Sequence, residues 1–359
     1  MNQHSEMFPG MTIGIDLGDR HSWYCCLDQS GQVTKRGRVS TTPEAFRKLF
    51  GALPPARIAL EVGTHSGWAS RELASGGHEV LVSNARKLAL VYGDDHKSDQ
   101  IDAEKLARLA RIDPHLLHPI RHRSAQAQAD LAVLRARHAL VETRTRLVNL
   151  LRGMLKSHGR RARSCSAKGF HRQVGAVVPD ELRPALAPLI EMLTAIAAQI
   201  RCYDNLLEQL CEERYPETER LRQVHGVGPI TALGFVLTLE DPHRFSRSRT
   251  VGAFLGLSPR TWQSGSLNRP MRITKAGDED LRRWLVGSAQ YVLGPFGVDC
   301  DLRRYGERLH RRGGRAAKKR AVVAVARKLA VLLHRLWITG EPYEPLRLAQ
   351  RTRVATTAA

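Results

Sequence analysis

The stretch TIGIDLGDRHSWYCCLDQSGQVTKRGRVS, residues 12–40, decides the fold of the N-terminal part of the chain. Its apolar runs cover residues 12–17, 22–27 and 33–40, and turn-forming residues separate them. Short apolar and β-branched runs between such turns are typical of strands. Three strands in a hairpin meander are therefore predicted.

The elements that follow complete an α/β pattern. Helical and strand patterns alternate over residues 42–50, 57–62, 65–75, 79–83 and 99–111. The resulting order, βββαβαβα, is that of the ribonuclease-H-like (Holliday-resolvase-like) fold, a mixed sheet covered by helices. An actin-like ATPase fold shares this order and the Asp-Leu-Gly sequence of residues 16–18. That fold needs a second glycine-rich phosphate loop, and the chain offers no convincing one.

The remainder of the chain is predicted to be mostly helical. Two long helical patterns, residues 125–158 and 184–214, favour a coiled-coil spacer or an oligomerisation arm. Further on, helices are expected over residues 278–291 and 316–337, with a glycine-rich turn at 224–230 and loops at 157–175, 254–259 and 263–270. The predicted domains are a ribonuclease-H-like metal-carboxylate domain (1–120), the helical spacer (121–215), a basic, mostly α C-terminal domain (216–345) and a disordered tail (346–359).

Charge separates these parts. The chain of 359 residues has a net charge of +21 and a pI near 10.4. Residues 1–100 hold 11 basic and 11 acidic side chains, so all of the surplus lies in the remaining 259 residues. Such a surplus is typical of proteins with a polyanionic partner, most often nucleic acid. No cysteine pair has zinc-site spacing, no signal peptide is apparent and no membrane span is expected, which favours a cytoplasmic, nucleoid-associated protein.

Four carboxylates are candidates for a metal site. Asp16 and Glu61 end the first and fourth predicted strands, which are neighbours in a ribonuclease-H-like sheet, and Asp99 and Asp102 share one face of a helix start. Clustered carboxylates need a compensating cation, and magnesium, with manganese as a substitute, prefers such oxygen ligands and suits phosphodiester cleavage. Each residue also has a plainer interpretation, as a strand-end solvated group or a helix N-terminal charge.

Five motifs carry a resemblance to a known family. They are GIDLGDRHSWYCCLDQSG (14–31), LEVGTHSGW (60–68), HKSDQIDAEKLARLA (96–110), HGVGPITALGFVLTLEDPHRF (225–245) and FLGLSPRTWQSGSLNRPMRITKAGDEDLRRWLVGSA (254–289). They resemble the bacterial insertion-sequence transposases of the DEDD type, which include pilin-gene invertases. The resemblance covers nearly the whole chain.

The resemblance implies a set of roles. Asp16, Glu61, Asp99 and Asp102 would be the catalytic metal-binding tetrad, and Ser264, with Ser266 as the second choice, would be the catalytic serine that forms a covalent phosphoserine. DNA would be the substrate, a noncoding RNA would serve as guide, and a dimer or tetramer would assemble. The residues expected to bind nucleic acid are Gly226, Gly228, Arg260, Arg269, Arg272, Lys275, Arg282 and Arg283. The glycine pair resembles the turn of a helix-hairpin-helix, although a plain turn between helices fits equally well.

Three functions remain to be separated. The first is a DNA recombinase that uses the metal and Ser264. The second is a structure-specific nuclease of the Holliday-junction-resolvase type, with water as the nucleophile. The third is a nucleic-acid-binding scaffold without catalysis.

Overall fold

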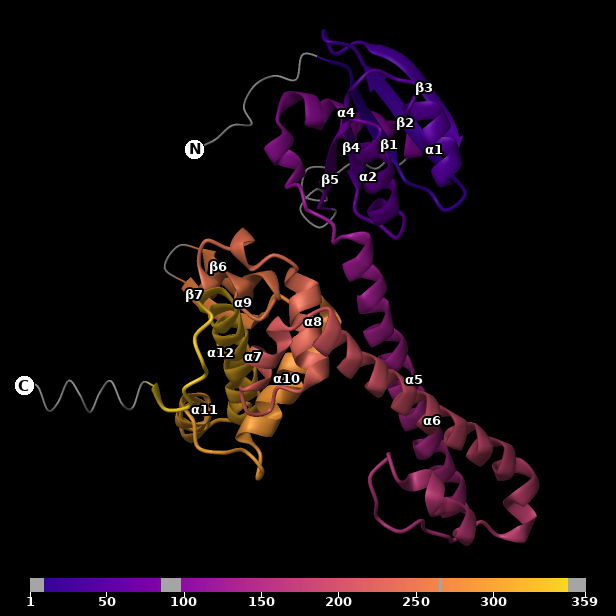
Figure 1. Ribbon diagram of the computed structural model, residues 1–359, viewed down its shortest axis with the longest axis vertical. Helices are drawn as coiled ribbons and strands as arrows, with labels where there is room; N and C mark the ends of the chain where they lie inside the picture. The colour runs from indigo at the N-terminus through magenta and orange to yellow at the C-terminus, as the bar shows by residue number, and fades with distance from the viewer. Residues whose placement is uncertain (1–9, 85–97, 265–266, 348–359) are drawn as a thin grey trace, which may run out of the picture. The chain divides into compact units, whose positions relative to one another are not determined.

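The computed structural model describes residues 10–84, 98–264 and 267–347, and for residues 261–270 only the backbone. Within these limits the chain forms two compact units, Met1–Ala125 and Gln126–Ala359, which are described separately (Figure 1). Ser266 and nearly all of the tail expected to be disordered lie outside the described residues.

The N-terminal unit contains a five-stranded mixed sheet. Its strands are β1 (Thr12–Asp16), β2 (His21–Leu27), β3 (Val33–Ser40), β4 (Arg57–Glu61) and β5 (Glu79–Ser83). Their order is β3-β2-β1-β4-β5, in which β1 pairs antiparallel with β2 and parallel with β4. The predicted element order and the adjacency of the first and fourth strands are therefore confirmed.

Helices cover both faces of this sheet. The helices are α1 (Pro43–Phe50), α2 (Ser66–Ser75) and α4 (Asp99–Ile112), followed by the 3-10 turn η1 (Pro114–Leu117). Ile13, Ile15 and Ile58 pack on one face in a core shared with α1 and α2. On the opposite face, Ala59 and Cys25 pack against α4. The sheet is thus a middle layer between two helical layers.

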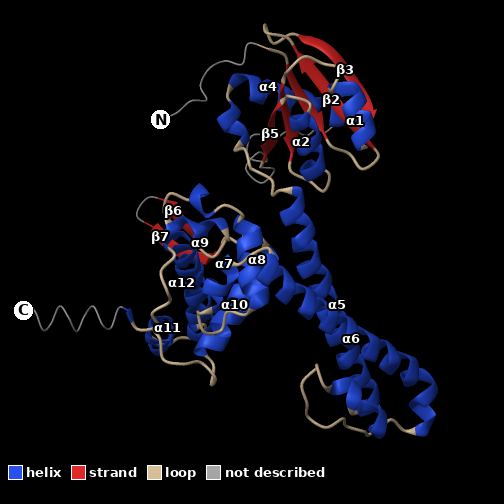
Figure 2. Cartoon of the chain, viewed as in Figure 1, coloured by secondary structure: helices blue, strands red, loops and turns tan. Residues whose placement is uncertain are grey.

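The C-terminal unit is mostly helical (Figure 2). A long pair, α5 (Ala125–Ser157) and α6 (Arg183–Glu213), precedes α7 (Glu217–Arg222), α8 (Pro229–Leu239), α9 (Val251–Phe254), α10 (Glu279–Leu293), α11 (Asp301–Arg311) and α12 (Ala317–Thr339). Short 3-10 turns lie at Phe170–Arg172, Val174–Val177, Asp180–Leu182, Pro242–Arg244 and Ser248–Thr250. Most of the apolar face of α12 lies in the core of this bundle.

The long pair runs antiparallel. Leu131 near the start of α5 shares a core with Leu210 near the end of α6, whereas Leu155 near the end of α5 shares a core with Leu186 near the start of α6. By length and hydropathy alone the segment Asp180–Glu213 could also cross a membrane. Core helices pass the same test, and the apolar side chains of α6 pack against α5 at both ends.

One sequence prediction needs correction, and two features of the C-terminal unit were not anticipated. Residues 263–264 and 267–270, predicted as part of a loop, belong to two paired antiparallel strands, β6 (Pro259–Ser264) and β7 (Leu267–Ile273). The loop predicted over residues 157–175 follows the end of α5, and it includes short 3-10 turns and the fully buried Phe170 and Val174. Helix α11 was not expected, because its sequence DLRRYGERLHR is too charged for its single buried stripe, Leu302 and Gly306, to stand out.

Candidate functional site

Asp16 and Glu61 end neighbouring parallel strands. Their predecessors Ile15 and Leu60 are paired in register, so the two carboxylates lie at the same edge of the sheet. Side chains alternate between the faces of a strand. Asp16 therefore shares the face of Gly14, and Glu61 shares the face of Ala59, which is the face that α4 covers. Both residues are partly buried.

Helix α4 runs antiparallel to these strands. Arg57, the first residue of β4, donates a hydrogen bond of 3.4 Å from Nη1 to the carbonyl of Ala110, near the C-terminus of α4. Further along the strands, Gly14 faces Ala103, near its N-terminus. The N-terminal turn, with Asp99 and Asp102, therefore lies toward the edge at which Asp16 and Glu61 end. All four predicted carboxylates share one edge and one face of the sheet.

A seam of small residues sets this position. A Cβ atom placed on Gly14 would lie 2.5 Å from the backbone nitrogen of Ala107 and closer still to the carbonyl oxygen of Ala103. Ala103, Ala107 and Ala110 are fully buried, whereas the larger Ile101 is 40% exposed. The helix therefore packs on β1 through alanines instead of large side chains. Sequence reasoning missed the role of Gly14, although the spacing of the three alanines was a usable signal.

Polar contacts hold α4 against the β2–β3 hairpin as well. Glu104 accepts hydrogen bonds from Arg36 of β3 at 2.5 Å and from Arg108 at 2.7 Å. The hydrogen bond from Arg36 holds the pKa of the Glu104 carboxyl below its usual value, against the opposing effect of burial. Arg111 donates to the carbonyl of Gln29 at 2.5 Å. The helix start is thus fixed in direction by several contacts along its length.

The sheet edge at Asp16, Glu61, Asp99 and Asp102, here called the carboxylate edge, does not form a compact metal site. Among the described residues, no three Asp, Glu, His or Cys side chains lie close enough together to hold a metal ion. Asp99 is exposed and Asp102 is partly buried. The four residues end two strands and begin one helix, and carboxylate oxygens are the donors that magnesium prefers.

The loops that follow β1 and β4 add one contact that the sequence did not indicate. His65 Nδ1 accepts a hydrogen bond of 3.1 Å from the indole nitrogen of Trp68, and His65 Nε2 lies 3.8 Å from a carboxylate oxygen of Asp19. The hydrogen bond from Trp68 orients the imidazole. This pair joins the two loops at the carboxylate edge.

Ser264 lies in the other unit, at the end of strand β6. Its backbone pairs with Leu267 of β7, so the residue stands at the end of the strand pairing. A hairpin end is a more defined position than the flexible loop expected from the sequence. Strand pairing therefore restrains the backbone that carries the predicted nucleophile.

The base of this hairpin is a close backbone crossing. Gly256 and Gly277 both have positive φ, at 68° and 75°. A Cβ on Gly256 would lie 2.7 Å from the carbonyl carbon of Lys275 and closer to the backbone of Ala276, and one on Gly277 would overlap the carbonyl of Phe254. Only glycine combines this conformation with this proximity. The segments that enter and leave the hairpin are held together here.

Arg282 closes the hairpin base, a role that the sequence did not indicate. Its Nη1 donates to the carbonyls of Leu255 at 3.2 Å, Ala276 at 2.9 Å and Asp278 at 3.3 Å. One nitrogen thus links both segments of the crossing to the start of α10. Because this half-buried guanidinium bonds to the protein through Nη1, it has a structural role, and its predicted phosphate contact stays a prediction.

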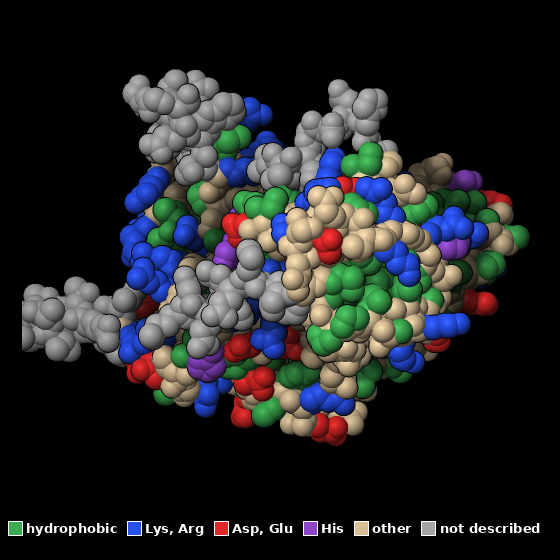
Figure 3. All heavy atoms as spheres, turned by 90° about the horizontal axis from the view of Figure 1, so that it is seen from above, with side chains coloured by type: hydrophobic (Ala, Val, Ile, Leu, Met, Phe, Trp, Pro, Cys, Tyr) green, Lys and Arg blue, Asp and Glu red, His purple; other side chains and the backbone are tan. Residues whose placement is uncertain are grey.

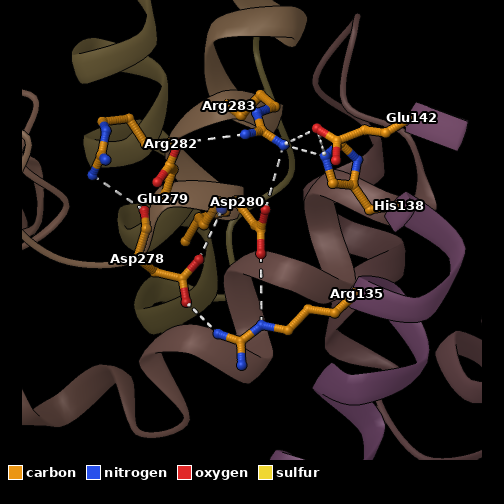
Figure 4. Close-up of polar contacts among 9 residues, drawn as sticks. Arg135, His138, Glu142, Asp278, Glu279, Asp280, Arg282 and Arg283 are labelled. Atoms are coloured by element: carbon orange, nitrogen blue, oxygen red, sulfur yellow. Dashed lines mark hydrogen bonds and ion pairs between the residues drawn. The ribbon is translucent and has the colours of Figure 1, made fainter. Parts of the chain in front are cut away.

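Arg283 is likewise engaged within the protein (Figure 4). It forms a hydrogen bond with His138 of α5 and lies 3.3 Å from the Glu142 carboxylate and 3.6 Å from the Asp280 carboxylate. On the same helix pair, Arg135 lies 3.2 Å from Asp278. The network joins α5 to α10, so neutralisation by acidic neighbours weakens the prediction that Arg283 binds phosphate.

The glycine pair Gly226 and Gly228 forms the turn between α7 and α8. Gly226 has a φ of 88°, and a Cβ there would lie 3.1 Å from the ring of Tyr291 and 3.2 Å from the carbonyl of Ser288. Gly228 is exposed and precedes α8, whose first turn has no side-chain cap. The turn between two helices is confirmed, and its use in phosphate binding stays a prediction.

The remaining basic candidates surround the hairpin. Arg260 and Arg272 are exposed on its strands, and Lys275 is exposed where β7 ends. Arg260 donates to the carbonyl of Thr274 at 3.3 Å. Arg269 pairs with Trp262 in the strand register, and its side chain is not described. Lys and Arg side chains recur across the face shown in Figure 3 and gather most densely at its left. Such a surface suits a polyanion.

Comparison with known proteins identifies the family. Residues 13–159 match a family model described as a transposase, of the DEDD IS110 type, and residues 218–296 match the model of the transposase IS116/IS110/IS902 family. The putative transposase y4pF/y4sB of Sinorhizobium fredii is 34% identical over 82% of this chain and 76% of its own length. The probable family 20 transposase of Pseudomonas aeruginosa is 30% identical over 78% of this chain and 83% of its own length.

A shorter match is to a protein named for gene inversion. The pilin gene-inverting protein of Moraxella lacunata is 26% identical over 34% of this chain and 38% of its own length. Fold and matches together define a transposase, an enzyme that recombines DNA. More narrowly, the chain belongs to the IS116/IS110/IS902 transposase family, and the resemblance inferred from its motifs is confirmed.

Proposed function

We propose that this transposase cuts and rejoins DNA with a divalent-metal site at Asp16, Glu61, Asp99 and Asp102 and with Ser264 as the nucleophile. The observation that carries the proposal is the shared edge. Two strand ends in register and the start of an antiparallel helix lie toward the same edge of one sheet, which supports a shared role for the four residues.

Magnesium fits the donor set of this edge. The four residues would hold it through carboxylate oxygens, and manganese would substitute for it. When bound, the metal would neutralise charge on a scissile phosphate and polarise its oxygens. The Gly14 seam and the Arg36–Glu104 pair would keep the α4 donors aimed at the strand donors.

Ser264 supplies a chemistry that conserves phosphate ester bonds. Attack by its hydroxyl oxygen on a phosphodiester forms a phosphoserine, breaks one phosphorus–oxygen bond and leaves a strand end that takes up a proton. Attack by the hydroxyl of a second strand reverses these changes and restores the serine. Rejoining then needs no external energy source. The backbone position of Ser264, at a restrained hairpin end, supports this role.

The proposed partners are DNA, a guide RNA and further copies of the chain. DNA is the substrate on which transposases act, and the surplus of +21 suits its phosphates. The guide RNA enters the proposal through the family resemblance. Assembly of a dimer or tetramer would allow several strands to be cut together, and the α5–α6 pair is the element offered for this contact.

The rival activity is a nuclease of the Holliday-junction-resolvase type. It would use the same carboxylate edge, with water in place of Ser264. In that case Ser264 would be only a hairpin residue. The two activities differ in whether a covalent protein–DNA species forms.

Trapping on denaturing gels tests the proposal. Purified protein is incubated with magnesium, the guide RNA and DNA that carries the element's end. A band that resists denaturant and contains both labelled DNA and protein is expected for the wild type. Ser264→Ala should abolish the band, and Asp16→Asn should abolish both the band and cleavage.

Two variants serve as controls for the trapping experiment. Ser258→Ala, one residue before β6, should retain the band, and Ser266→Ala tests the second serine. A band that persists in Ser264→Ala but is lost in Ser266→Ala would transfer the role to Ser266. Strand cleavage by Ser264→Ala at the wild-type rate, without any covalent species in either protein, would establish the nuclease instead.

A further inference from the structure

The far end of the α5–α6 pair carries an unusual charge distribution. Residues 143–179 contain nine Lys and Arg and no Asp or Glu. They include the end of α5 and the segment that leads to α6, here called the arm lobe (residues 156–179). Most of the lobe lies outside both family models, which cover residues 13–159 and 218–296. Its chemistry has so far been left unassigned.

The arm lobe is a folded structure. Phe170 and Val174 are fully buried in a core with Leu151 and Leu155 of α5. Arg152 contributes to this core, because its guanidinium lies 5.0 Å from the centre of the Phe170 ring and donates to the carbonyl of Cys165 at 3.0 Å. One cation of the segment is therefore used in packing.

The cations of the arm lobe itself are exposed to solvent. None of them forms an ion pair within the part of the chain that the structure describes. The exposed set is Lys156, Arg160, Arg161, Arg163, Lys168 and Arg172. Burial, followed by the charges of Arg172, Arg201 and Arg144, lowers the pKa of His171 beneath this surface. The lobe thus carries positive potential that the protein itself leaves unneutralised.

The composition of the lobe selects among polyanions. Single-stranded nucleic acids are usually gripped by exposed aromatic rings on which bases stack. The only aromatic residue from 143 to 179 other than histidine is Phe170, and it is fully buried. The surface therefore offers phosphate contacts alone, as suits a double helix whose bases are paired. A second copy of the lobe would be repelled by the like charges.

The position of the lobe also favours a long, stiff partner. Leu131, in the core at the base of the α5–α6 pair, and Leu155, in the lobe core, are separated by 24 helical residues, or ~36 Å of α5. One turn of a DNA double helix spans about 34–36 Å. A duplex of more than one turn can contact both the C-terminal bundle and the lobe.

We propose that the arm lobe binds the sugar–phosphate backbone of double-stranded DNA, away from the bases that undergo strand exchange. The contact adds affinity and fixes the direction of the duplex along the C-terminal unit without reading sequence. The inference rests on DNA being the substrate, as the proposed function has it. It does not depend on the identity of the nucleophile.

The salt dependence of binding tests the proposal. Arg160, Arg161 and Arg163 lie in the exposed segment after α5 and are replaced together by Gln. Binding of the full protein to a labelled DNA duplex of about 50 base pairs is measured by anisotropy between about 50 and 300 mM salt. Each lost phosphate contact lowers the slope of log affinity against log salt by about 0.9, so a decrease of about 2–3 is expected.

A matched triple variant controls for net charge. Lys35→Gln, Arg38→Gln and Lys48→Gln remove the same charge from exposed positions of β3 and α1, and the slope should change by less than one contact. Thermal melts of both triples should match the wild type. An unchanged slope in the lobe variant, or equal changes in both triples, would overturn the proposal.

Two further arms separate the alternatives. In the lobe variant, affinity for an RNA duplex of the same length should fall less than affinity for the DNA duplex. A larger fall for the RNA duplex would mean that the arm lobe binds RNA instead of DNA. Ser264→Ala should keep the wild-type slope, so failure of the covalent mechanism and failure of the arm lobe contact give different results.

Discussion

The two units hold their candidate chemical groups in different ways. In the N-terminal unit, α4 lies on β1 through Gly14, Ala103 and Ala107, with no ionisable group in the contact. In the C-terminal unit, the hairpin that ends at Ser264 is held by the crossing at Gly256 and Gly277 and by the hydrogen bonds of Arg282. One support is an apolar fit, and the other is a polar clamp.

The difference reflects what each support must resist. The N-terminal turn of α4 carries two of the candidate carboxylates, and a close fit over several residues holds that helix in every direction. The hairpin has few large side chains at its base, so directional hydrogen bonds to backbone carbonyls supply its rigidity. Both supports depend on glycine at the point of closest backbone approach. They should therefore respond differently to substitution and to acid.

Substitution in the seam should have the largest effect. Gly14→Ala forces a methyl group against the backbone of Ala103 and Ala107, which flexible side chains cannot relieve. We expect a loss of about 3 kcal/mol or more in the free energy of unfolding, and loss of DNA cleavage, because α4 must move away from the sheet. Urea unfolding and a cleavage assay measure the two effects.

Gly153→Ala controls for the added methyl group. Gly153 lies in α5, and a Cβ there would meet nothing within 4 Å. Removing a helical glycine should stabilise the protein by about 0.5–1 kcal/mol. A Gly14→Ala variant as stable as the wild type would show that the seam is not a close fit.

Removal of the polar clamp should have the next largest effect. Arg282→Met retains much of the side-chain volume but leaves the carbonyls of Leu255 and Ala276 without their donor. We expect a loss of about 2–3 kcal/mol in stability. Formation of the Ser264 adduct should fall more than tenfold, while DNA affinity falls little, since this guanidinium faces the protein.

Arg260→Met is the matched control for the clamp. Arg260 is exposed and makes one hydrogen bond, to the carbonyl of Thr274. Its loss should lower DNA affinity and leave stability nearly unchanged. If Arg282→Met instead weakened DNA binding as strongly as Arg260→Met, the result would support the phosphate contact that the sequence predicts for Arg282.

The sequence predicted the N-terminal unit better than its supports. Short apolar runs in β1 and β4 indicated the sheet, and the ends of these strands indicated Asp16 and Glu61. The role of Gly14 in the first strand was not predicted, because the contact that requires a glycine there is visible only when the opposing helix is known. The alanines of α4 gave a weak periodic signal for the same reason.

The C-terminal unit was less accessible from sequence. Gly, Ser and Pro between residues 254 and 270 suggested loops, whereas cross-strand pairing makes a hairpin of this segment. Pairing partners are chosen by tertiary context, which composition does not encode. The basic residues near Ser264 were grouped by sequence distance alone, so Arg282, which points inward, could not be told from Arg260, which lies exposed.

Acid sharpens the comparison through a second polar clamp, at Asp130 of α5. Its buried carboxylate accepts hydrogen bonds from Tyr215 at 2.7 Å and Arg214 at 2.8 Å. Burial raises the pKa of Asp130, but the hydrogen bonds from Tyr215, Arg214 and Gln126 outweigh it and lower the pKa below the ordinary 3.8. A lowered pKa in the folded state means that this contribution to stability is complete above the unfolded-state pKa and is lost as the pH falls through the folded-state pKa.

Asp130→Asn should therefore cost about 1–2 kcal/mol at neutral pH, the smallest of the three effects, and progressively less below the ordinary pKa of aspartate. The cost of Gly14→Ala should not change over the same range, because its contact has no group that titrates. Urea unfolding of wild type and both variants at neutral pH and near pH 3 measures the differences. A constant cost for Asp130→Asn across this range would mean that the carboxylate contributes through shape rather than charge, and the contrast between the apolar seam and the polar clamps would then fail at this position.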